Sequence, residues 1–300
     1  MAFAFADERP PGLVAALPDG AETSVRHDPG AMHARWTGAA PARTREVRDR
    51  ARVRLTVDHD PERGYLIDAP GIGAALIVAG GREVVCAPAG PDWAALLVGQ
   101  ILPLVATVRG LEVFHAAGVA VGGRGFLLAG AQGAGKTSLA AHLVLGGAQL
   151  LSDDVTAVDD ALGAHPGSSL LRVRPGALGA LNGGGLTDLE PAGTSRGRTA
   201  LLAPAPAGAV PLAGIYHLER ATSGSLIERM AQPSPIDLIA LTFNISVRTR
   251  ARLTHQLDLC ARLAEAIPVF RVRIMPGRDA AEVAGALRAH MERRMAAARA

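Results

Sequence analysis

One run of eight residues constrains the fold of this chain more than any other feature. Residues 130–137 read Gly-Ala-Gln-Gly-Ala-Gly-Lys-Thr, which matches the pattern GxxxxGK[ST]. The apolar residues 125–129 before it are typical of a short buried strand. Residues 138–145 after it favour a helix, which Gly146-Gly147 ends. The order strand, glycine-rich loop, helix predicts an α/β fold with a phosphate-binding loop, the P-loop, between the strand and the helix.

The residue types in this run suit the binding of a nucleoside triphosphate. Its glycines let backbone N–H groups turn toward phosphate oxygens, and the following helix adds the positive end of its dipole. Lys136 is the only lysine of the chain, and a compact ammonium fits inside such a loop where a planar guanidinium does not. Thr137 is placed to hold Mg²⁺ through its hydroxyl. The predicted nucleotide-binding residues are Gly130, Ala131, Gln132, Gly133, Ala134, Gly135, Lys136, Thr137 and Ser138.

Composition and charge limit the other properties of the chain. Hydrophobic residues make up 49% of it and aromatics 3%, so we expect a core of Ala, Leu and Val. The net charge of +3 comes from scattered arginines without interleaved aromatics, so no nucleic-acid partner is expected. Cys86 and Cys260 are few and far apart, which favours reduced thiols and a cytoplasmic location. From these patterns we expect no signal peptide, no membrane-spanning segment and no membrane partner.

Patterns along the chain predict three parts. We expect a loosely ordered arm over residues 1–50, with short ordered pieces around Trp36, and a small β-rich unit over residues 51–92. The phosphate-binding domain follows over residues 93–300. The β-rich unit is predicted from strand-like alternation from Val53 onward and a Gly80-Gly81 hairpin turn. The arginines that precede or enter its first strand predict a solvated edge; they are Arg43, Arg45, Arg48, Arg50, Arg52 and Arg54.

Within the third part, residues 93–108 predict a helix. Residues 183–212 are rich in Gly, Pro and Ala and predict a mobile loop, whose Arg196 and Arg198 could meet phosphate or acidic groups. Arg172 and Arg174 are interpreted as solvated arginines at a strand edge. Strands are expected at residues 213–218 and 269–274, and a final helix is expected from Asp279, its N-cap. Five apolar residues at helical spacing predict a buried helix face: Leu253, Leu257, Cys260, Leu263 and Ile267.

A pair of carboxylates, Asp153 and Asp154, follows the predicted strand of residues 148–152. A right-handed crossover makes this strand parallel to the strand of the P-loop, so both carboxyl ends open at the same edge of the sheet. Two carboxylates there can supply a metal contact and a general base, both of which phosphoryl transfer needs. The alternative is an aspartate pair that caps a turn.

A lone histidine, His115, lies in the apolar residues 111–121. They predict a strand that pairs with residues 125–129 across a Gly122-Gly123 turn. A histidine in such a run is more often a satisfied strand residue than a functional one.

In order and spacing, His115, the P-loop, Gly146-Gly147 and Asp153-Asp154 resemble the catalytic domain of HPr kinase/phosphorylase and its relatives, which include kinases of lasso-peptide precursors. The resemblance covers residues 109–156. It implies a P-loop kinase domain of the HPr kinase type that uses ATP and Mg²⁺, and it makes His115, Lys136, Asp153 and Asp154 catalytic. The resemblance implies that Lys136 binds phosphate, that Thr137 holds the metal, and that Asp154 takes the proton of the substrate hydroxyl with Asp153, a further candidate metal ligand, beside it. The sequence alone leaves the division of roles between the two aspartates open. The family's segment with a further metal-binding Glu is not found after the aspartates, and a homo-oligomer is left open.

The sequence thus predicts an ATP-dependent serine kinase that acts on a Ser/Thr hydroxyl of a peptide or small protein. A small-molecule kinase on the same scaffold and a nucleotide-binding regulator without turnover stay open. A GTPase usually recognises the guanine base through an Asn-Lys-x-Asp motif, and the chain has no second lysine to form it. The Leu-Ser-Gly-Gly-Gln signature of transporter ATPases is absent as well.

Overall fold

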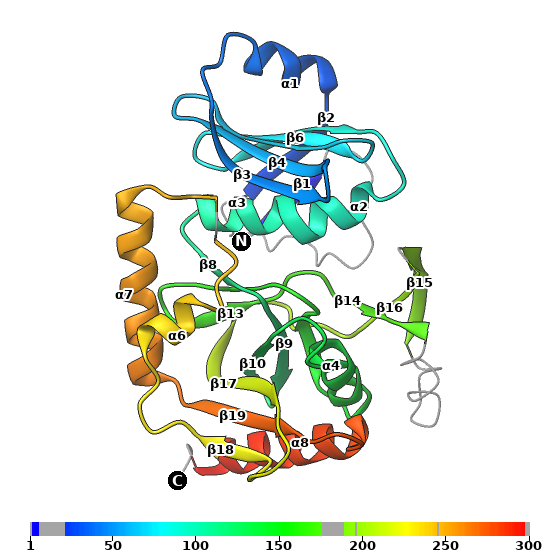
Figure 1. Cartoon of the computed structure of the whole chain (residues 1–300), viewed down its shortest axis with the longest axis vertical. Helices are drawn as coiled ribbons and strands as arrows, with labels where there is room; N and C mark the ends of the chain where they lie inside the picture. The colour runs from blue at the N-terminus through cyan, green and yellow to red at the C-terminus, as the bar shows by residue number, and fades with distance from the viewer. Residues whose placement is uncertain (1, 6–21, 176–188, 196, 245, 298–300) are drawn as a thin grey trace. The chain divides into compact units, whose positions relative to one another are not determined.

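A computed structural model of the chain describes residues 2–5, 22–175, 189–195, 197–244 and 246–297. It is a mixed α/β structure that divides into two compact units (Figure 1). Unit 1 comprises the described residues within Met1–Pro10, Ala15–Leu111 and Asn244–Leu253. Unit 2 comprises those within Glu112–Phe243 and Thr254–Ala300. None of the helices in the described part of the chain has the length and apolar character needed to cross a bilayer.

Unit 1 is built on a sheet in the strand order β1-β2-β7-β6-β5-β4-β3. The strands expected from Val53 onward are present as an antiparallel meander, with Gly80 and Gly81 in the turn between β6 and β7. Alternate residues point into the core, where Ile67, Ile77 and Val84 are fully buried. The strands are β1 (Ala2–Phe5), β2 (Glu22–His27), β3 (Ala42–Asp49), β4 (Arg52–Asp60), β5 (Gly64–Ala69), β6 (Gly73–Val78) and β7 (Glu83–Pro88).

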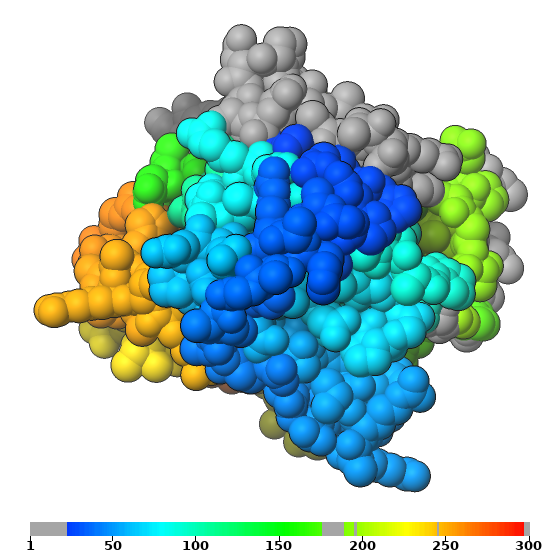
Figure 2. All heavy atoms as spheres, turned by 90° about the horizontal axis from the view of Figure 1, so that it is seen from above, coloured from blue at the N-terminus to red at the C-terminus, as the bar shows by residue number. Residues whose placement is uncertain are grey.

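The described residues of the expected N-terminal arm, 22–50, form regular structure and not a loosely ordered segment. Strand β2 pairs in parallel with β7, and its Thr23 side chain is buried and donates to the Gly81 carbonyl (2.8 Å). Asp28 caps helix α1 (Pro29–Trp36) by accepting from the Ala31 amide (2.8 Å). This helix has no buried residue, and Figure 2 shows this part of the unit as a blue surface. Pairing with a strand distant in sequence orders the segment, which local patterns do not reveal.

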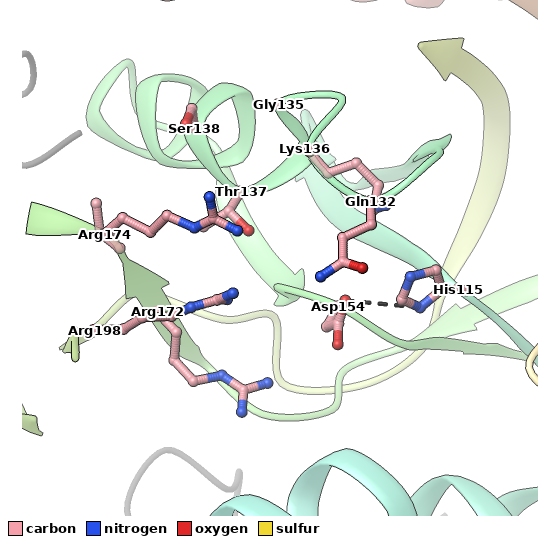
Figure 3. Close-up of a pocket in the computed structure, with 12 residues that line it drawn as sticks. His115, Gln132, Gly135, Lys136, Thr137, Ser138, Asp154, Arg172, Arg174 and Arg198 are labelled. Carbon is pink, nitrogen blue, oxygen red and sulfur yellow. Dashed lines mark ion pairs between the residues drawn. The ribbon is translucent and has the colours of Figure 1, made fainter. Parts of the chain in front are cut away.

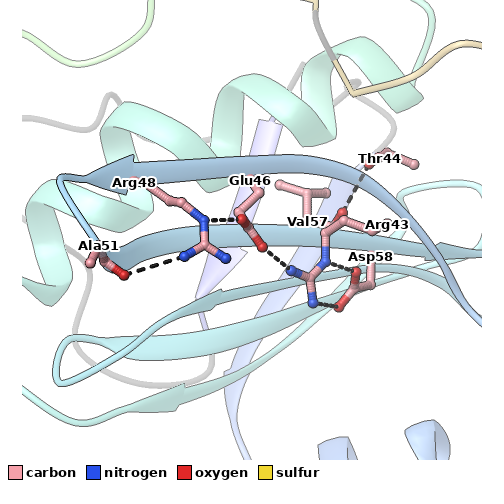
Figure 4. A network of polar contacts seen from close by, with 7 residues as sticks. All are labelled: Arg43, Thr44, Glu46, Arg48, Ala51, Val57 and Asp58. Atoms are coloured by element: carbon pink, nitrogen blue, oxygen red, sulfur yellow. Dashed lines mark hydrogen bonds and ion pairs between the residues drawn. The ribbon is translucent and has the colours of Figure 1, made fainter.

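Two arginines of the basic edge of unit 1, Arg43 and Arg48, pair with neighbouring carboxylates, as Figure 4 shows. Arg43 pairs with Asp58 on β4 and with Glu46 (2.8 Å to Oε2), and Glu46 also pairs with Arg48. Arg45 donates to the side-chain oxygen of Gln100 (2.9 Å). These contacts agree with the predicted solvated edge, and exposed pairs of this kind add little to stability.

The helix expected over residues 93–108 is present but interrupted. It consists of α2 (Trp93–Leu96), a π-helical segment η1 (Leu97–Ile101) and α3 (Leu102–Val108). Pro103 is the second residue of α3 and lies directly after the π-helical segment. The buried Leu97, Ile101 and Val105 give the helix one apolar face, and its residues belong to unit 1. The boundary between the units therefore lies after Leu111, not near residue 92.

Unit 2 is built on a sheet that is covered by helices on both faces. Its central strands run in the order β11-β9-β10-β17-β19, and β8, β12, β13 and β18 extend it. Helices α4 and α8 pack on one face, where Leu139 and Leu287 contact the core, and α7 packs on the other through Leu259 and Leu263 (Figure 1). The bounds are β8 (Glu112–Phe114), β9 (Ala116–Val121), β10 (Arg124–Gly130), α4 (Lys136–Leu145), β11 (Gln149–Ser152), β12 (Thr156–Val158), β13 (Gly163–His165), β17 (Val210–Arg220), β18 (Ile227–Arg229), α6 (Pro235–Ile239), α7 (Arg250–Ala266), β19 (Val269–Ile274) and α8 (Ala280–Ala297).

The arrangement of β10 and β11 fixes the position of the site. Each pairs antiparallel with β9, which lies between them, so β10 and β11 are parallel as predicted but not adjacent. Their carboxyl ends therefore open at the same edge of the sheet, and the P-loop and the aspartate pair follow there. The prediction of one continuous strand over residues 111–121 is wrong. The chain breaks at His115, since β8 pairs with β12 whereas β9 pairs with β10.

The expected mobile loop, residues 183–212, is regular structure in most of its described part. Strand β16 (Arg198–Leu202) pairs with β14 (Leu170–Val173) and β15 (Glu190–Ser195) in a small antiparallel sheet. Ala200 and Leu201 of β16 are buried. Apolar residues of this segment thus pack in the core in spite of the surrounding Gly and Pro. Residues 183–188 and Arg196 of the expected loop lie outside the described residues.

The predicted helical period of α7 is correct, but its buried face is shifted. Leu253 and Leu257 are largely exposed, whereas Arg252 and Gln256 are buried. The fully buried Glu112 explains the polar position at Gln256, whose amide nitrogen lies 3.3 Å from Glu112 Oε1. A buried carboxylate needs polar neighbours, so the helix turns this side chain and not Leu257 inward.

Gln256→Leu is expected to lower the free energy of unfolding by about 1–3 kcal/mol, because it removes a donor to the buried Glu112 and to Thr242 Oγ1 (2.8 Å). Leu257→Gln, at the exposed neighbouring position, should change stability by less than about 0.5 kcal/mol. Equilibrium urea unfolding of both variants measures the difference. Equal changes in unfolding free energy for the two variants would mean that the hydrogen bonds of Gln256 to Glu112 and Thr242 do not stabilise the fold.

Candidate active site

The P-loop connects the end of β10 to the start of α4, and glycine conformations shape it. Gly133 and Gly135 have φ values of 83° and 100°, which residues with a Cβ rarely adopt. Gly135 is the N-cap of α4 and offers no side chain to the helix. The backbone amides at this helix end are thus available to an anionic ligand.

Gly130 is required for a different reason, the closeness of a neighbouring strand. Its φ is 144°, and a Cβ added there would stand 2.6 Å from the carbonyl oxygen of Leu218 on β17. A Cβ at Gly133 would meet no atom within 4 Å, although the φ value there is also unfavourable.

Gly130→Ala is therefore expected to destabilise the chain by about 1–3 kcal/mol more than Gly133→Ala, because strain and a backbone clash combine only at the first position. Urea unfolding measures the free energy of unfolding of both variants. Because both carry φ strain, the difference between them reports the clash with Leu218. Equal losses of unfolding free energy in the two variants would show that the short distance to Leu218 does not require glycine at position 130.

A cavity of about 390 Å³ lies at the mouth of the P-loop (Figure 3). It brings together most of the residues predicted from the sequence. Gly130 and Ala131 line an adjoining cavity instead, Ala134 lines neither, and Asp153 lies buried nearby. The lining residues are His115, Gln132, Gly133, Gly135, Lys136, Thr137, Ser138, Asp154, Arg172, Val173, Arg174 and Arg198.

Lys136, the first residue of α4, extends along the P-loop. Its Nζ donates to the carbonyl oxygens of Gly130 (2.7 Å) and Ala131 (3.3 Å). Burial lowers the pKa of this ammonium group, while the negative charges of Asp154 and Asp153 favour its charged form. Two carbonyl oxygens of the P-loop thus hold the Lys136 ammonium group at the cavity.

The two aspartates have different surroundings. Asp153 is only 5% exposed, and its Oδ2 accepts from the Arg172 amide (2.9 Å). Burial raises the pKa of Asp153, whereas hydrogen bonds from that amide and from the Thr137 side chain act in the opposite direction. Oδ1 of Asp153 is buried and has no hydrogen-bond partner among the described residues.

This donor set fits a magnesium ion. Asp153 has a buried carboxylate oxygen without a hydrogen-bond partner among the described residues, the Thr137 hydroxyl lines the same site, and Mg²⁺ prefers such oxygen ligands. No cluster of three His, Cys, Asp or Glu able to hold a metal occurs among the described residues. Mg²⁺ that is bound together with substrate phosphates usually takes only one or two ligands from the protein.

Asp154, in contrast, opens into the cavity. Its side chain is 48% exposed, and its Oδ1 lies 3.7 Å from Nδ1 of His115. His115 stands at the break between β8 and β9, where its amide donates to the Leu241 carbonyl (2.8 Å). The break allows the imidazole to face Asp154, and Figure 3 shows the Gln132 side chain extending toward the same pair. Asp154 is placed to accept a proton from a bound group.

Three arginines give the cavity a positive character. Arg172 and Arg174 flank the buried Val173, so they share the opposite face of the strand, and Arg198 comes from the neighbouring β16. None of the three guanidinium groups forms an ion pair or hydrogen bond with another residue in the described part of the chain. Only a longer-range attraction links Arg172 to Asp153. All three line the cavity, and Figure 3 shows them on the side of Asp154 that lies away from His115.

Arg172 and Arg174 were not predicted as site residues, because their sequence pattern indicates solvated arginines at a strand edge. The Arg-Val-Arg alternation could have indicated a shared face but not that this face turns toward the P-loop. Arg198 lies where the sequence suggested a contact with phosphate or acidic groups.

Comparisons with known proteins yield a distant likeness among solved structures. No protein-family model matches the chain, and no curated protein does. Among solved structures it is similar to the Hpr(Ser) kinase/phosphatase from Coxiella burnetii. The identity is 12%, the match covers 60% of this chain and 97% of that chain, and the TM-score is 0.32. At this level the relationship is structural and distant, so the function has to be argued from the residues of the site.

Proposed function

We propose that the chain is an ATP-dependent kinase that transfers the γ-phosphate to a Ser or Thr hydroxyl of a peptide or small protein. One observation carries the proposal. A solvent-open carboxylate, Asp154, lines the same cavity as the P-loop, its lysine and three arginines without ion pairs among the described residues. A phosphate-binding loop alone suits any nucleotide-binding protein, whereas the carboxylate adds a group that can accept a proton.

The charges of the cavity suit a triphosphate. Four cationic side chains and one carboxylate line it, in addition to the backbone amides of the P-loop. Arginine forms bidentate hydrogen bonds with phosphate oxygens, and lysine acts as a compact point charge. We assign Lys136 to the terminal phosphates, and Arg172, Arg174 and Arg198 to the stabilisation of charge on the transferred group.

Thr137 and Asp153 would hold Mg²⁺, the Thr through its hydroxyl and the Asp through Oδ1. When bound, the ion would neutralise part of the negative charge of the phosphates. The hydrogen bond from the Arg172 amide fixes the orientation of the Asp153 carboxylate. The deep burial of Asp153 makes it unsuited to take a proton from an incoming substrate.

Asp154 acts as the general base in this scheme. The acceptor O–H bond breaks and its proton passes to the Asp154 carboxylate. A bond forms between that oxygen and the γ-phosphorus, the bond from the γ-phosphorus to the bridging oxygen breaks, and ADP leaves. His115 is a positioning residue, because its imidazole faces Asp154 Oδ1 at 3.7 Å and limits the orientations of the carboxylate.

The test is to incubate the chain with γ-labelled ATP, Mg²⁺ and a library of serine- and threonine-containing peptides, with free sugars, amino acids and nucleosides in parallel. We expect label on peptide hydroxyls, located by mass spectrometry. Label only on a small molecule would replace the peptide kinase by a small-molecule kinase. Tight ATP binding without transfer to any acceptor would support a regulator without turnover.

A further inference from the structure

A second cavity of about 500 Å³ adjoins the first in unit 2. His115 and Gln132 line both cavities, so the two spaces meet at these side chains. Figure 3 shows His115 and Gln132 beside Asp154, whereas Arg174 and Ser138 lie at the other side of the first cavity. The second cavity thus begins at the proposed base.

The walls of the second cavity are largely apolar. Met230, Leu238, Leu241 and Val269 contribute to them. Its size falls within the range of cavities that bind small molecules or a few side chains, about 300–1,000 Å³. A hydrophobic space of this kind takes up apolar groups and gains little from a triphosphate.

The charges of the second cavity also differ from those of the first. Arg271, its arginine, is paired with Glu219 (3.4 Å), and Glu219 is paired in addition with Arg273 (3.2 Å). Asp237 adds a negative charge, with one oxygen accepting from the Ser234 amide (3.1 Å). The first cavity has three arginines without such pairs among the described residues, so an anionic nucleotide is drawn there and an apolar or cationic group to the second cavity.

We propose that the second cavity binds the acceptor, and that it receives an apolar side chain next to the serine or threonine that is phosphorylated. This inference rests on the proposed function, because it places the substrate of that reaction. A hydroxyl beside an apolar side chain seated among Met230, Leu238 and Leu241 reaches Asp154 past His115. Acidic residues next to the acceptor are disfavoured by Asp237 and by the paired state of Arg271.

A substitution that fills the second cavity separates acceptor binding from nucleotide binding. Ala240 lines this cavity and is exposed, so tryptophan can be placed there without disturbing the core. Ala231 is also exposed and close in sequence but lines neither cavity, so Ala231→Trp is the matched control. The probes are a serine-centred peptide library with varied flanking residues, γ-labelled ATP, and a fluorescent ATP analogue for nucleotide affinity.

We expect the wild-type chain to label peptides with apolar residues beside the serine in preference to those with acidic ones. Ala240→Trp should raise the KM for the preferred peptide at least ~10-fold, with the affinity for the ATP analogue within about twofold of wild type. Ala231→Trp should leave both quantities unchanged.

Four other results would overturn the inference. A weakened affinity of Ala240→Trp for the ATP analogue would assign the second cavity to the nucleoside. Unchanged peptide labelling by that variant, or a wild-type preference for acidic flanks, would leave the kinase in place but move its acceptor elsewhere. No labelling of any peptide by wild type would remove the proposed function and this inference with it.

Discussion

Lys136→Ala is expected to reduce turnover of Mg²⁺-ATP by at least ~10²-fold, the usual scale for removing one charged donor aimed at the reacting group. The ammonium group lies at the cavity, and within the described part of the chain its hydrogen bonds go to the carbonyl oxygens of Gly130 and Ala131. Loss of such bonds costs about 0.5–1.5 kcal/mol each, so the variant should remain folded. Steady-state ATP turnover, with circular dichroism as a check on the fold, measures both consequences.

Lys136→Arg is the matched control, because it keeps the charge but replaces the compact ammonium by a planar group. We expect it to be almost as inactive as the alanine variant. Near-normal turnover of a folded Lys136→Ala chain would exclude the P-loop from the reaction. Full activity of Lys136→Arg would show that charge alone suffices.

Asp154→Asn is expected to lower phosphate transfer by at least ~10²-fold while nucleotide affinity stays close to that of wild type, because an amide cannot take the acceptor proton. Asp153→Asn should lower transfer to a similar degree by a different route, since it weakens the hold on Mg²⁺. Titration of activity with Mg²⁺ separates the two. The Asp153 variant should need a higher concentration of the ion, and the Asp154 variant should not.

The exposures of the two carboxylates motivate this division, with Asp153 buried beside Thr137 and Asp154 open beside His115. A loss of nucleotide affinity in both variants would reduce both residues to metal binding or structural support. A raised requirement for Mg²⁺ in the Asp154 variant alone would reverse the assignment.

Local patterns in the sequence carry enough information to predict the centre of the site. The P-loop, strand β10 and helix α4 follow from glycine spacing and apolar runs, and the shared edge of β10 and β11 follows from crossover geometry. These features involve residues that are close in sequence. Their conformations depend on backbone preferences of individual residue types, such as the freedom of glycine to adopt positive φ.

Features that depend on distant partners could not be predicted in this way. The break at His115 arises because β8 pairs with β12 and β9 with β10. The buried face of α7 depends on Glu112, which lies far away in the chain. The presence of Arg172 in the cavity depends on how β14 packs beside the P-loop. Each case needs a tertiary contact that no local periodicity contains.

The central claim is that Asp154 activates a hydroxyl for attack on a phosphate held by the P-loop. It is tested most directly by a single-turnover experiment with γ-labelled ATP, Mg²⁺ and the preferred serine peptide, using wild type and Asp154→Asn at equal nucleotide saturation. We predict phosphoserine on the peptide with wild type, and at least ~10²-fold slower formation with the variant. Equal rates of phosphoserine formation by the two chains would contradict the claim.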